Sequence, residues 1–252
     1  PRRGNSPEHR NSAYGPQFMP DEEKPILGHF ATYRFSLDFW DLDADDRRDE
    51  ALAWFQRIGS TADVAQLYLT QGIESDSDVL VWTTATVDDV GVPARFFKDR
   101  AAADNAGRHV AELDHVLWGM TRPSQYSRAK SAQEIDPYAD DERTTYLVMY
   151  PFTKTADWYL KGRDTRQGMM NEHIRIGKQF TDIKQLLLYS FGLQDQEFVV
   201  VYETEDLELF SKLVYDLRDT EARIYTKADT PLHTAVRLSP DEWAAGLGPA
   251  AD

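Results

Sequence analysis

The sequence predicts an α+β fold in which one β-α-β-β-α-β unit occurs twice. Eight short runs have the alternation or the β-branched and aromatic content of strands, and helical patterns lie between them. The order of these elements is strand–helix–strand–strand–helix–strand, and that order repeats once along the chain. The two halves also resemble each other locally, which indicates an internal duplication.

The predicted strands and helices cover most of the chain. The strands are expected at 28–37, 64–71, 78–85, 113–119, 144–151, 183–191, 197–203 and 222–227. The helix predicted over 43–58 begins with an acidic turn and spaces Leu52, Phe55 and Ile58 on one side. The helix predicted over 205–219 places five apolar side chains on one face: Leu207, Phe210, Leu213, Val214 and Leu217.

The duplication is visible in two matching segments of the sequence. GIESDSDVLVWTTATVDDV, from Gly72, and GLQDQEFVVVYETEDLELF, from Gly192, share a glycine turn, an acidic stretch, a buried strand and an acidic helix start. A β-α-β-β-α-β unit is a ferredoxin-like repeat. Two such sheets can bury their helix-free faces against each other, so we expect a dimeric-type α/β barrel with the helices outside. Two independent α+β domains are the alternative.

The polar segments divide the chain into five parts. We expect an N-terminal arm, a first ferredoxin-like repeat, a linker, a second repeat that carries the functional site, and a C-terminal tail at 1–25, 26–120, 121–143, 144–240 and 241–252. The Ala/Gly/Pro-rich ending could also be a linker to a further domain.

Composition excludes several classes of protein. The net charge of −15 argues against a general nucleic-acid or anionic-membrane binder. The absence of cysteine excludes disulfides, thiolate metal sites and covalent c-type haem attachment, and it suits a cytoplasmic protein. No apolar run is long enough for a membrane span. Nineteen arginines against nine lysines, on an acidic chain, are typical of a protein adapted to high salt.

One window reverses the sign of the charge. Residues 143–184 contain eight basic and four acidic side chains, a local charge of +4 in a chain of −15. A solvated helix face is one interpretation, and a site for carboxylates or phosphates is the other. Aromatic residues are interleaved with these cations: Tyr146, Tyr150, Trp158 and Tyr159. This mixture suits a flat, apolar ligand with several negative charges.

A histidine lies in the same window, on the apolar side of a predicted helix. At helical spacing His173 shares a face with four apolar side chains: Met169, Met170, Ile176 and Phe180. A core histidine is one interpretation. The other is an axial ligand to the iron of a porphyrin, whose propionates would need the cations. No HExxH or paired-histidine pattern supports a bare zinc or non-haem iron site.

Four segments carry a resemblance to a known family. VMYPFTKTADWYL (148–160), NEHIRIG (171–177), residues 192–218 and EARIYTKADTPLHT (221–234) resemble the chlorite dismutase-like haem proteins, and within them the coproheme decarboxylase branch. The resemblance implies two ferredoxin-like repeats per subunit and assembly into a homo-oligomer, usually a pentameric ring. Some salt-adapted, archaeal-type members are expected to be fused to a monooxygenase-like ferredoxin domain, and this chain would then be the haem domain.

The resemblance assigns roles to individual residues. His173 matches the proximal iron ligand, Tyr150 the tyrosine that becomes a radical, and Lys154 the lysine beside the reacting propionate. Trp158 matches a pocket tryptophan, and Lys178 stands where relatives have an arginine near a propionate. Met170 would then belong to the apolar wall behind the ligand.

The implied reaction uses iron-coproporphyrin III and hydrogen peroxide. The Tyr150 radical takes hydrogen from a propionate, carbon dioxide leaves, and two rounds give haem b. The peroxide-activating group is open: Gln185 is the candidate if one residue is deleted in the alignment, and Lys184 and Leu186 share the uncertainty. The segment 181–192 has no arginine, which argues against chlorite dismutation. The alternatives are a haem peroxidase without decarboxylase turnover and a haem carrier or sensor. Glu221 is a weak candidate partner of the His173 ring.

Overall fold

The computed structural model describes residues 24–126, 131–139 and 143–247. The first half contains six main elements: β1 (Ile26–Phe35), α2 (Ala44–Gly59), β2 (Val64–Leu69), β3 (Val79–Thr86), α3 (Val92–Ala106) and β4 (Ala111–Met120). The second half repeats them as β5 (Tyr146–Lys154), α5 (Arg163–Gly177), β6 (Lys184–Tyr189), β7 (Phe198–Thr204), α6 (Leu207–Arg218) and β9 (His233–Leu238). The smaller elements are α1 (Leu37–Trp40), α4 (Ala156–Leu160), η1 (Glu221–Tyr225), β8 (Thr226–Ala228) and α7 (Pro240–Gly246).

Eight strands close into a barrel. The strand order is β7-β6-β4-β1-β3-β2-β9-β5-β8, and β7 also pairs with β5, so β8 is an extra strand on the edge of β5. Within each half the order is that of a ferredoxin-like sheet, and the halves join where β2 meets β9 and β4 meets β6. The α+β class and the paired repeats predicted from the sequence are therefore the observed fold.

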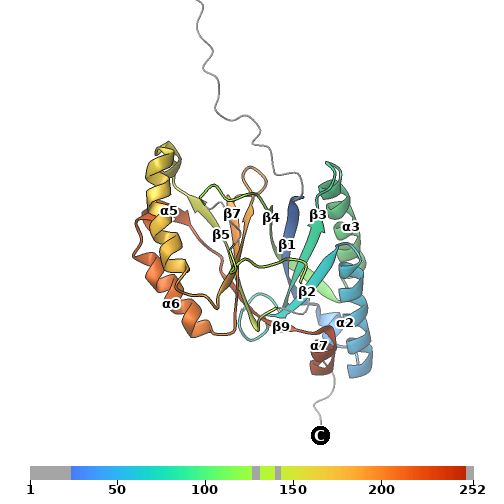
Figure 1. Cartoon of the computed structure of the whole chain (residues 1–252). Coiled ribbons are helices and arrows are strands. Elements are labelled where there is room, and N and C mark those ends of the chain that lie inside the picture. Colours follow the sequence, from blue (N-terminus) through green and yellow to red (C-terminus); the bar gives the residue numbers. More distant parts are fainter. Residues whose placement is uncertain (1–23, 127–130, 140–142, 248–252) are drawn as a thin grey trace, which may run out of the picture.

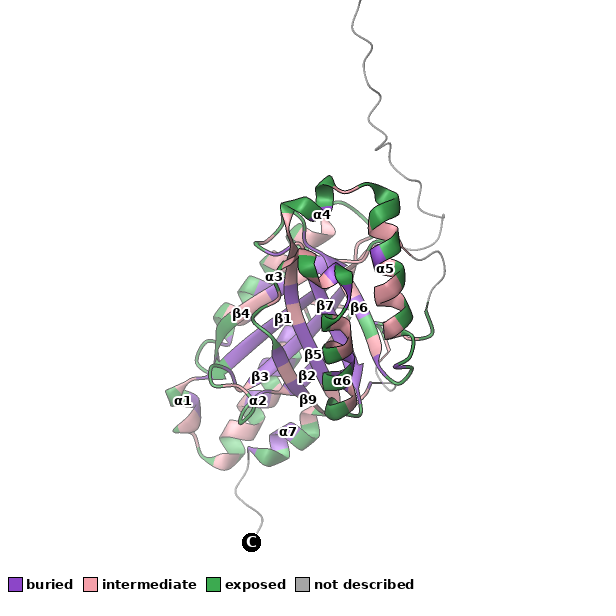
Figure 2. Ribbon diagram, turned by 90° about the vertical axis from the view of Figure 1, so that its left-hand side faces the viewer, coloured by how far each residue is buried: buried purple, intermediate pink, exposed green. Residues whose placement is uncertain are grey.

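Helices cover the two outer faces of this barrel. Figure 1 shows α5 and α6 on one side of the strands and α2 and α3 on the other. The barrel interior is filled by apolar side chains of both sheets, with Phe30, Trp82 and Leu147 among the largest. Separate clusters fill the space between each sheet and its own helices. Figure 2 shows the consequence: the strands are buried, and the outer surfaces of the helices are exposed.

Local chemistry explains where these elements begin. The Asp43 side chain accepts hydrogen bonds from the backbone of the first turn of α2, and Asp206 does the same for α6. The two duplicated glycine turns precede β3 and β7, and Gly72 and Gly192 both have a positive φ, at 79° and 70°.

The structure differs from the predicted elements at two places. Residues 221–225 form a 3₁₀ turn followed by the short β8, and the fourth strand of the second half is β9. The turn is fixed by bonds to the end of β5, where Thr155 N donates to Tyr225 O at 2.9 Å. The expected C-terminal tail includes the helix α7, whose Trp243 is 4% exposed and packs against α2. The N-terminal arm lies outside the described residues, apart from its last two.

Candidate functional site

Strand β5 presents the side chains of Val148, Tyr150 and Phe152 toward α5 and α6. Tyr150 and Phe152 pack into the cluster between this sheet and its helices, whereas Met149 lies in the barrel interior. The pairing of β5 with β8 shifts register between Thr153 and Lys154. Lys154 Nζ nevertheless lies 5.8 Å from the centre of the Phe152 ring, so the lysine is on the same outer face of the barrel as Phe152 and Tyr150.

The Lys154 ammonium is held at the base of this face. Its Nζ donates to the Ala222 carbonyl oxygen at 3.1 Å and to Thr226 Oγ1 at 3.3 Å, and it lies 4.8 Å from the centre of the Trp158 ring. Burial, and then the charge of Arg223, lower the pKa of Lys154 to about 8. The side chain is thus a cation at pH 7 and is close to its point of deprotonation.

His173 lies near Lys154, although the two come from a helix and a strand. Burial, and then the Lys154 charge, lower the pKa of His173 to about 4. The imidazole is neutral at pH 7, which is the state that can ligate iron. The Glu221 carboxylate makes no hydrogen bond to this ring in the described part of the chain. The Glu221 backbone N–H instead donates to Glu172 Oε2 at 3.2 Å.

The face of α5 that carries His173 is poorly covered by protein. Among its 15 residues α5 fully buries only Met169, whereas the 16-residue α2 fully buries four. Met170 and Ile176 are half-buried. A helix with an apolar face that its own sheet covers only in part fits a bulky apolar ligand.

The donor set around His173 fits a haem-type iron better than a bare ion. In the described ranges no group of three or more His, Cys, Asp or Glu side chains could hold a metal. A single neutral imidazole beside cations is what an iron already held by a porphyrin needs from the protein. The residues present therefore fit the porphyrin interpretation.

Trp158 and Met170 belong to one small cluster beside the lysine. Trp158, on α4, is 3% exposed and packs with Met169 and Ala222, and Met170 and Tyr225 contact the same group. The rings of Trp158 and Tyr225 are 5.8 Å apart between centroids. The structure thus brings Trp158 and Met170 together on one side of Lys154.

Tyr150 has partners that the sequence did not reveal. Burial raises the pKa of its phenol, and its ring stacks on that of Tyr202 with centroids 6.1 Å apart. The charge of Asp229 also raises the pKa of the Tyr150 phenol, and the charges of Arg218 and Arg223 lower it. Asp229 Oδ2 bridges the two arginines, 3.0 Å from Arg218 Nη1 and 2.8 Å from Arg223 Nη1. These groups lie after residue 184, beyond the basic window.

The register of β6 distinguishes the three candidates for the peroxide-activating group, Lys184, Gln185 and Leu186. Gln185 pairs with Tyr202 and so projects toward α5 and α6, whereas Leu186 lies in the barrel interior. Lys184 pairs with Glu203. Of the three, only Gln185 is directed to the outer face, where it is exposed. Residue 133 of the segment predicted as a linker accepts a hydrogen bond from Gln185 N at 2.7 Å.

The basic window is not one surface. Arg143 is buried inside the barrel, where its Nη1 lies 2.9 Å from Glu203 Oε1 and its guanidinium 4.4 Å from the centre of the Trp82 ring. This internal ion pair removes Arg143 from any external anion site. Lys178 is exposed at the C-terminal end of α5. The cations whose charges act on Tyr150 are instead Arg218 and Arg223, and the charge of Arg223 also acts on Lys154.

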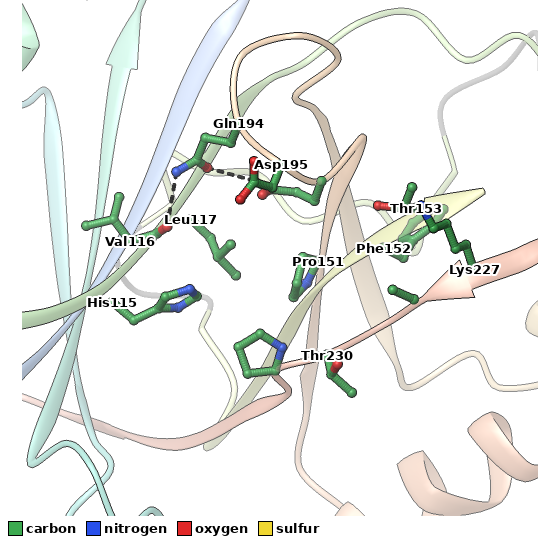
Figure 3. A pocket seen from close by; sticks show the side chains of 13 residues that line it. His115, Val116, Leu117, Pro151, Phe152, Thr153, Gln194, Asp195, Lys227 and Thr230 are labelled. Carbon is green, nitrogen blue, oxygen red and sulfur yellow. Dashed lines mark hydrogen bonds between the residues drawn. The ribbon is translucent and has the colours of Figure 1, made fainter. Parts of the chain in front are cut away.

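A separate pocket of about 570 Å³ lies between β4, β5 and the segment around Thr230, and Figure 3 shows the side chains that line it. His115, Pro151 and Pro231 line it, and the Gln194 side chain spans its edge by donating to Val116 O at 3.1 Å. Phe152 reaches it from β5, but neither Tyr150, Lys154 nor His173 lines it.

The fold agrees with the comparison to known proteins. The family model for chlorite dismutase matches residues 44–238. The chain belongs to the chlorite dismutase family. The resemblance found in the sequence is confirmed at that level.

Two relatives of this chain have different activities. A coproheme decarboxylase from Mycolicibacterium smegmatis is 27% identical over 81% of this chain and 87% of its own length. A chlorite dismutase from Ideonella dechloratans is 27% identical over 75% of this chain and 67% of its own length. Among solved structures, a mutant chlorite dismutase from Candidatus Nitrospira defluvii is 22% identical with a TM-score of 0.75, over 90% of this chain and 98% of that one.

Proposed function

We propose that this chlorite dismutase family member binds iron-coproporphyrin III and uses hydrogen peroxide to decarboxylate two of its propionates, giving haem b. The observation that carries the proposal is the approach of three side chains from two elements. Tyr150 and Lys154 share the outer face of β5, and His173 on α5 lies close enough to Lys154 for its pKa to be lowered by that charge. The 27% identity to a coproheme decarboxylase supports the same branch.

Each residue has a role that its environment supports. The neutral His173 imidazole would hold the iron, and Trp158 and Met170 would pack against the macrocycle. Lys154 would bind a propionate carboxylate, and Lys178 would provide a further cation. When bound, the iron porphyrin supplies the centre that reacts with peroxide and so the oxidising equivalents.

The chemistry of one round balances with peroxide as the only oxidant. One propionate, one hydrogen peroxide and one proton give one vinyl group, one carbon dioxide and two waters. Tyr150 gives up an electron and a proton to the first oxidising equivalent of the peroxide and then recovers a hydrogen atom from the propionate β-carbon. The second oxidising equivalent takes one electron from the resulting β-carbon radical, so that the bond to the carboxylate breaks, carbon dioxide leaves and the vinyl double bond forms. Lys154 holds the carboxylate still during that transfer, and the carbon dioxide that leaves is neutral and no longer attracted to it.

Gln185 is the group that we propose for the peroxide side of the ring. Its direction toward the outer face, and the inward direction of Leu186, support that choice over the neighbouring positions. Because β6 offers no arginine on this face, the proposal does not extend to chlorite dismutation. Replacing Gln185 with alanine is expected to slow the reaction with peroxide while leaving porphyrin binding intact.

Mass spectrometry of the porphyrin tests the proposal directly. Iron-coproporphyrin III is added to the purified protein, peroxide is titrated, and two successive losses of one carboxyl-derived unit are expected. Tyr150→Phe should bind the porphyrin and yield neither product. Bleaching of the porphyrin without any change of side-chain mass would refute decarboxylation and favour a peroxidase. An unchanged Soret spectrum in His173→Ala would refute the ligand assignment.

A further inference from the structure

The carboxylate of Glu197 lies at the end of strand β5. The last β5–β7 pair is Phe152 with Phe198, so Lys154 lies two residues beyond that ladder. The Glu197 side chain takes the place of a strand partner there, since Lys154 N donates to Glu197 Oε2 at 2.7 Å. The register of β5 with β8 also shifts at this point, between Thr153 and Lys154. Glu197 therefore fixes the backbone from which the Lys154 side chain starts.

The same carboxylate oxygen also holds helix α4. The Tyr159 hydroxyl donates to Glu197 Oε2, and the Tyr159 ring packs against Phe191 with centroids 6.0 Å apart. Burial, and then this hydrogen bond, raise the pKa of Tyr159, so the phenol keeps its proton and remains the donor. Trp158 is the preceding residue of α4, and its ring lies 4.8 Å from Lys154 Nζ. One oxygen atom thus joins the end of β5 to the helix that carries Trp158.

Lys154 is consequently held at both ends. Glu197 binds its backbone N–H, and its Nζ donates to the Ala222 carbonyl oxygen and to Thr226 Oγ1. An ammonium has three N–H groups, so one is left to donate to a carboxylate. A lysine loses much side-chain freedom when it is ordered, and a lysine that is already anchored spares a bound carboxylate that cost.

The charge of Glu197 acts on the same ammonium. Burial, and then the charge of Arg223, lower the pKa of Lys154 to about 8, and the charge of Glu197 opposes them. His173 faces Lys154 from α5 and is neutral at pH 7. Without the Glu197 charge the ammonium would lose its proton at a lower pH, closer to neutrality.

We propose that Glu197 is a positioning residue for Lys154: its carboxylate fixes the end of β5 and ties it to α4, so that the Lys154 ammonium and the Trp158 ring keep one arrangement toward a bound carboxylate. Glu197 acts through Lys154 and undergoes no covalent change. Because the bound carboxylate is taken to be a propionate of the porphyrin, this role deepens the proposed function and rests on it.

Three variants separate the hydrogen bonds of Glu197 from its charge. Glu197→Gln keeps an oxygen that can accept from Lys154 N and an amide that can donate to the Tyr159 oxygen, but it removes the charge. Glu197→Ala removes both the bonds and the charge. Glu205→Ala is the matched control, because the Glu205 carboxylate accepts hydrogen bonds from the backbone N–H and the hydroxyl of Thr145, directly before the other end of β5.

The first test needs no porphyrin. Lysine labelled with ¹³C and ¹⁵N is titrated by NMR, with Lys154 identified by Lys154→Arg, and amide exchange is followed in the same samples. In Glu197→Gln the Lys154 titration should move to lower pH, because the negative charge is gone. In Glu197→Ala the Lys154 amide should exchange about tenfold faster or more, because its acceptor is gone. Glu205→Ala should change neither.

The second test uses the porphyrin-loaded protein. Glu197→Ala should bind iron-coproporphyrin III with little change in affinity and lose about ten- to a hundredfold in kcat, because a displaced contact group costs up to about a hundredfold. Glu197→Gln should keep most of its kcat in mildly acidic solution, and its kcat/KM should begin to fall at a lower pH than in the unsubstituted protein. Glu205→Ala should keep both the turnover and the pH profile.

The outcomes separate this proposal from the proposed function. Unchanged amide exchange or unchanged turnover in Glu197→Ala, or an equal loss of turnover in Glu205→Ala, overturns the positioning role of Glu197. If Glu197→Ala does not fold, Glu197→Gln decides, and a Lys154 titration and pH profile that do not move overturn the role. If the unsubstituted protein forms no vinyl product, decarboxylation fails, and the Lys154 titration and amide exchange alone then decide whether Glu197 positions Lys154.

Discussion

Replacing His173 with glutamine should make the stability of the ligand-free protein less sensitive to acid. The half-buried imidazole has a pKa of about 4, lowered mainly by desolvation, against an ordinary value of 6.5. Between pH 6.5 and pH 4 the imidazole is protonated in the unfolded chain and neutral in the folded chain. The contribution is therefore complete above pH 6.5 and is lost as the pH falls toward 4.

The magnitude follows from the size of this window. At pH 5 the unfolded imidazole is 1.5 pH units below its ordinary pKa and almost fully protonated, while the folded one is still mostly neutral. At 1.36 kcal/mol per unit, about 2 kcal/mol of the free energy of unfolding is lost between pH 7 and pH 5 through this one side chain. His29, whose pKa burial lowers to about 3, adds a loss of its own. That loss is common to both proteins and cancels in their difference.

Urea unfolding at pH 7 and pH 5 measures the effect. The unsubstituted protein should lose about 2 kcal/mol more than His173→Gln does between these two values. Equal losses in the two proteins would show that the imidazole is not held neutral in the fold. The imidazole would then not be poised to ligate iron at neutral pH.

Three further changes test other parts of the structure. Above pH 8, kcat/KM for the iron porphyrin should fall about tenfold per pH unit, because Lys154 loses its charge there. Lys154→Arg should remove that fall. A fall that persists in this variant would show that Lys154 does not bind the carboxylate. Trp243→Ala should cost about 3–5 kcal/mol in urea unfolding, since this ring stacks on Phe35 inside the first-half core, and a cost below about 1 kcal/mol would mean that α7 is not part of it. Arg143→Met should destabilise the protein by about 3–5 kcal/mol by leaving Glu203 buried without its partner, and adding Glu203→Leu should recover most of that loss; no recovery would refute the pairing as the cause.

The duplicated fold could be predicted because its signals are local and repeated. The glycine turns at Gly72 and Gly192 each precede a buried strand and then a helix, and both glycines adopt a positive φ. The last strand of the second half was predicted at 222–227 but lies at His233–Leu238, because the sequence of β9 has only a weak strand pattern. His233 points into the barrel and is held by Glu74, with Nδ1 2.9 Å from Oε2, so a polar residue occupies an inward position where an apolar one is expected.

The candidate site was predictable where it lies on a single element. Tyr150 and Lys154 share a face because both belong to one strand, and His173 stands out on one helix. Tyr202 and Arg223 could not be found in this way, because only the strand register and the return of the chain after α6 bring them to Tyr150. No spacing rule in the sequence encodes that proximity.

The duplication itself shows why one half alone carries the candidate site. In the first half the corresponding face of the sheet is closed by its own polar network. Arg100, 3% exposed on α3, donates to the Tyr33 hydroxyl and to Thr83, and Tyr33 donates to Asp104 Oδ1 at 2.8 Å. These bonds satisfy the buried polar atoms internally and leave α3 fixed on the sheet. Helix α6 is the counterpart of α3 in the second half, and there Arg218 and Arg223 pair with Asp229 nearer the surface. We therefore propose that the same unit serves as a packed scaffold in the first copy and as a ligand-binding face in the second.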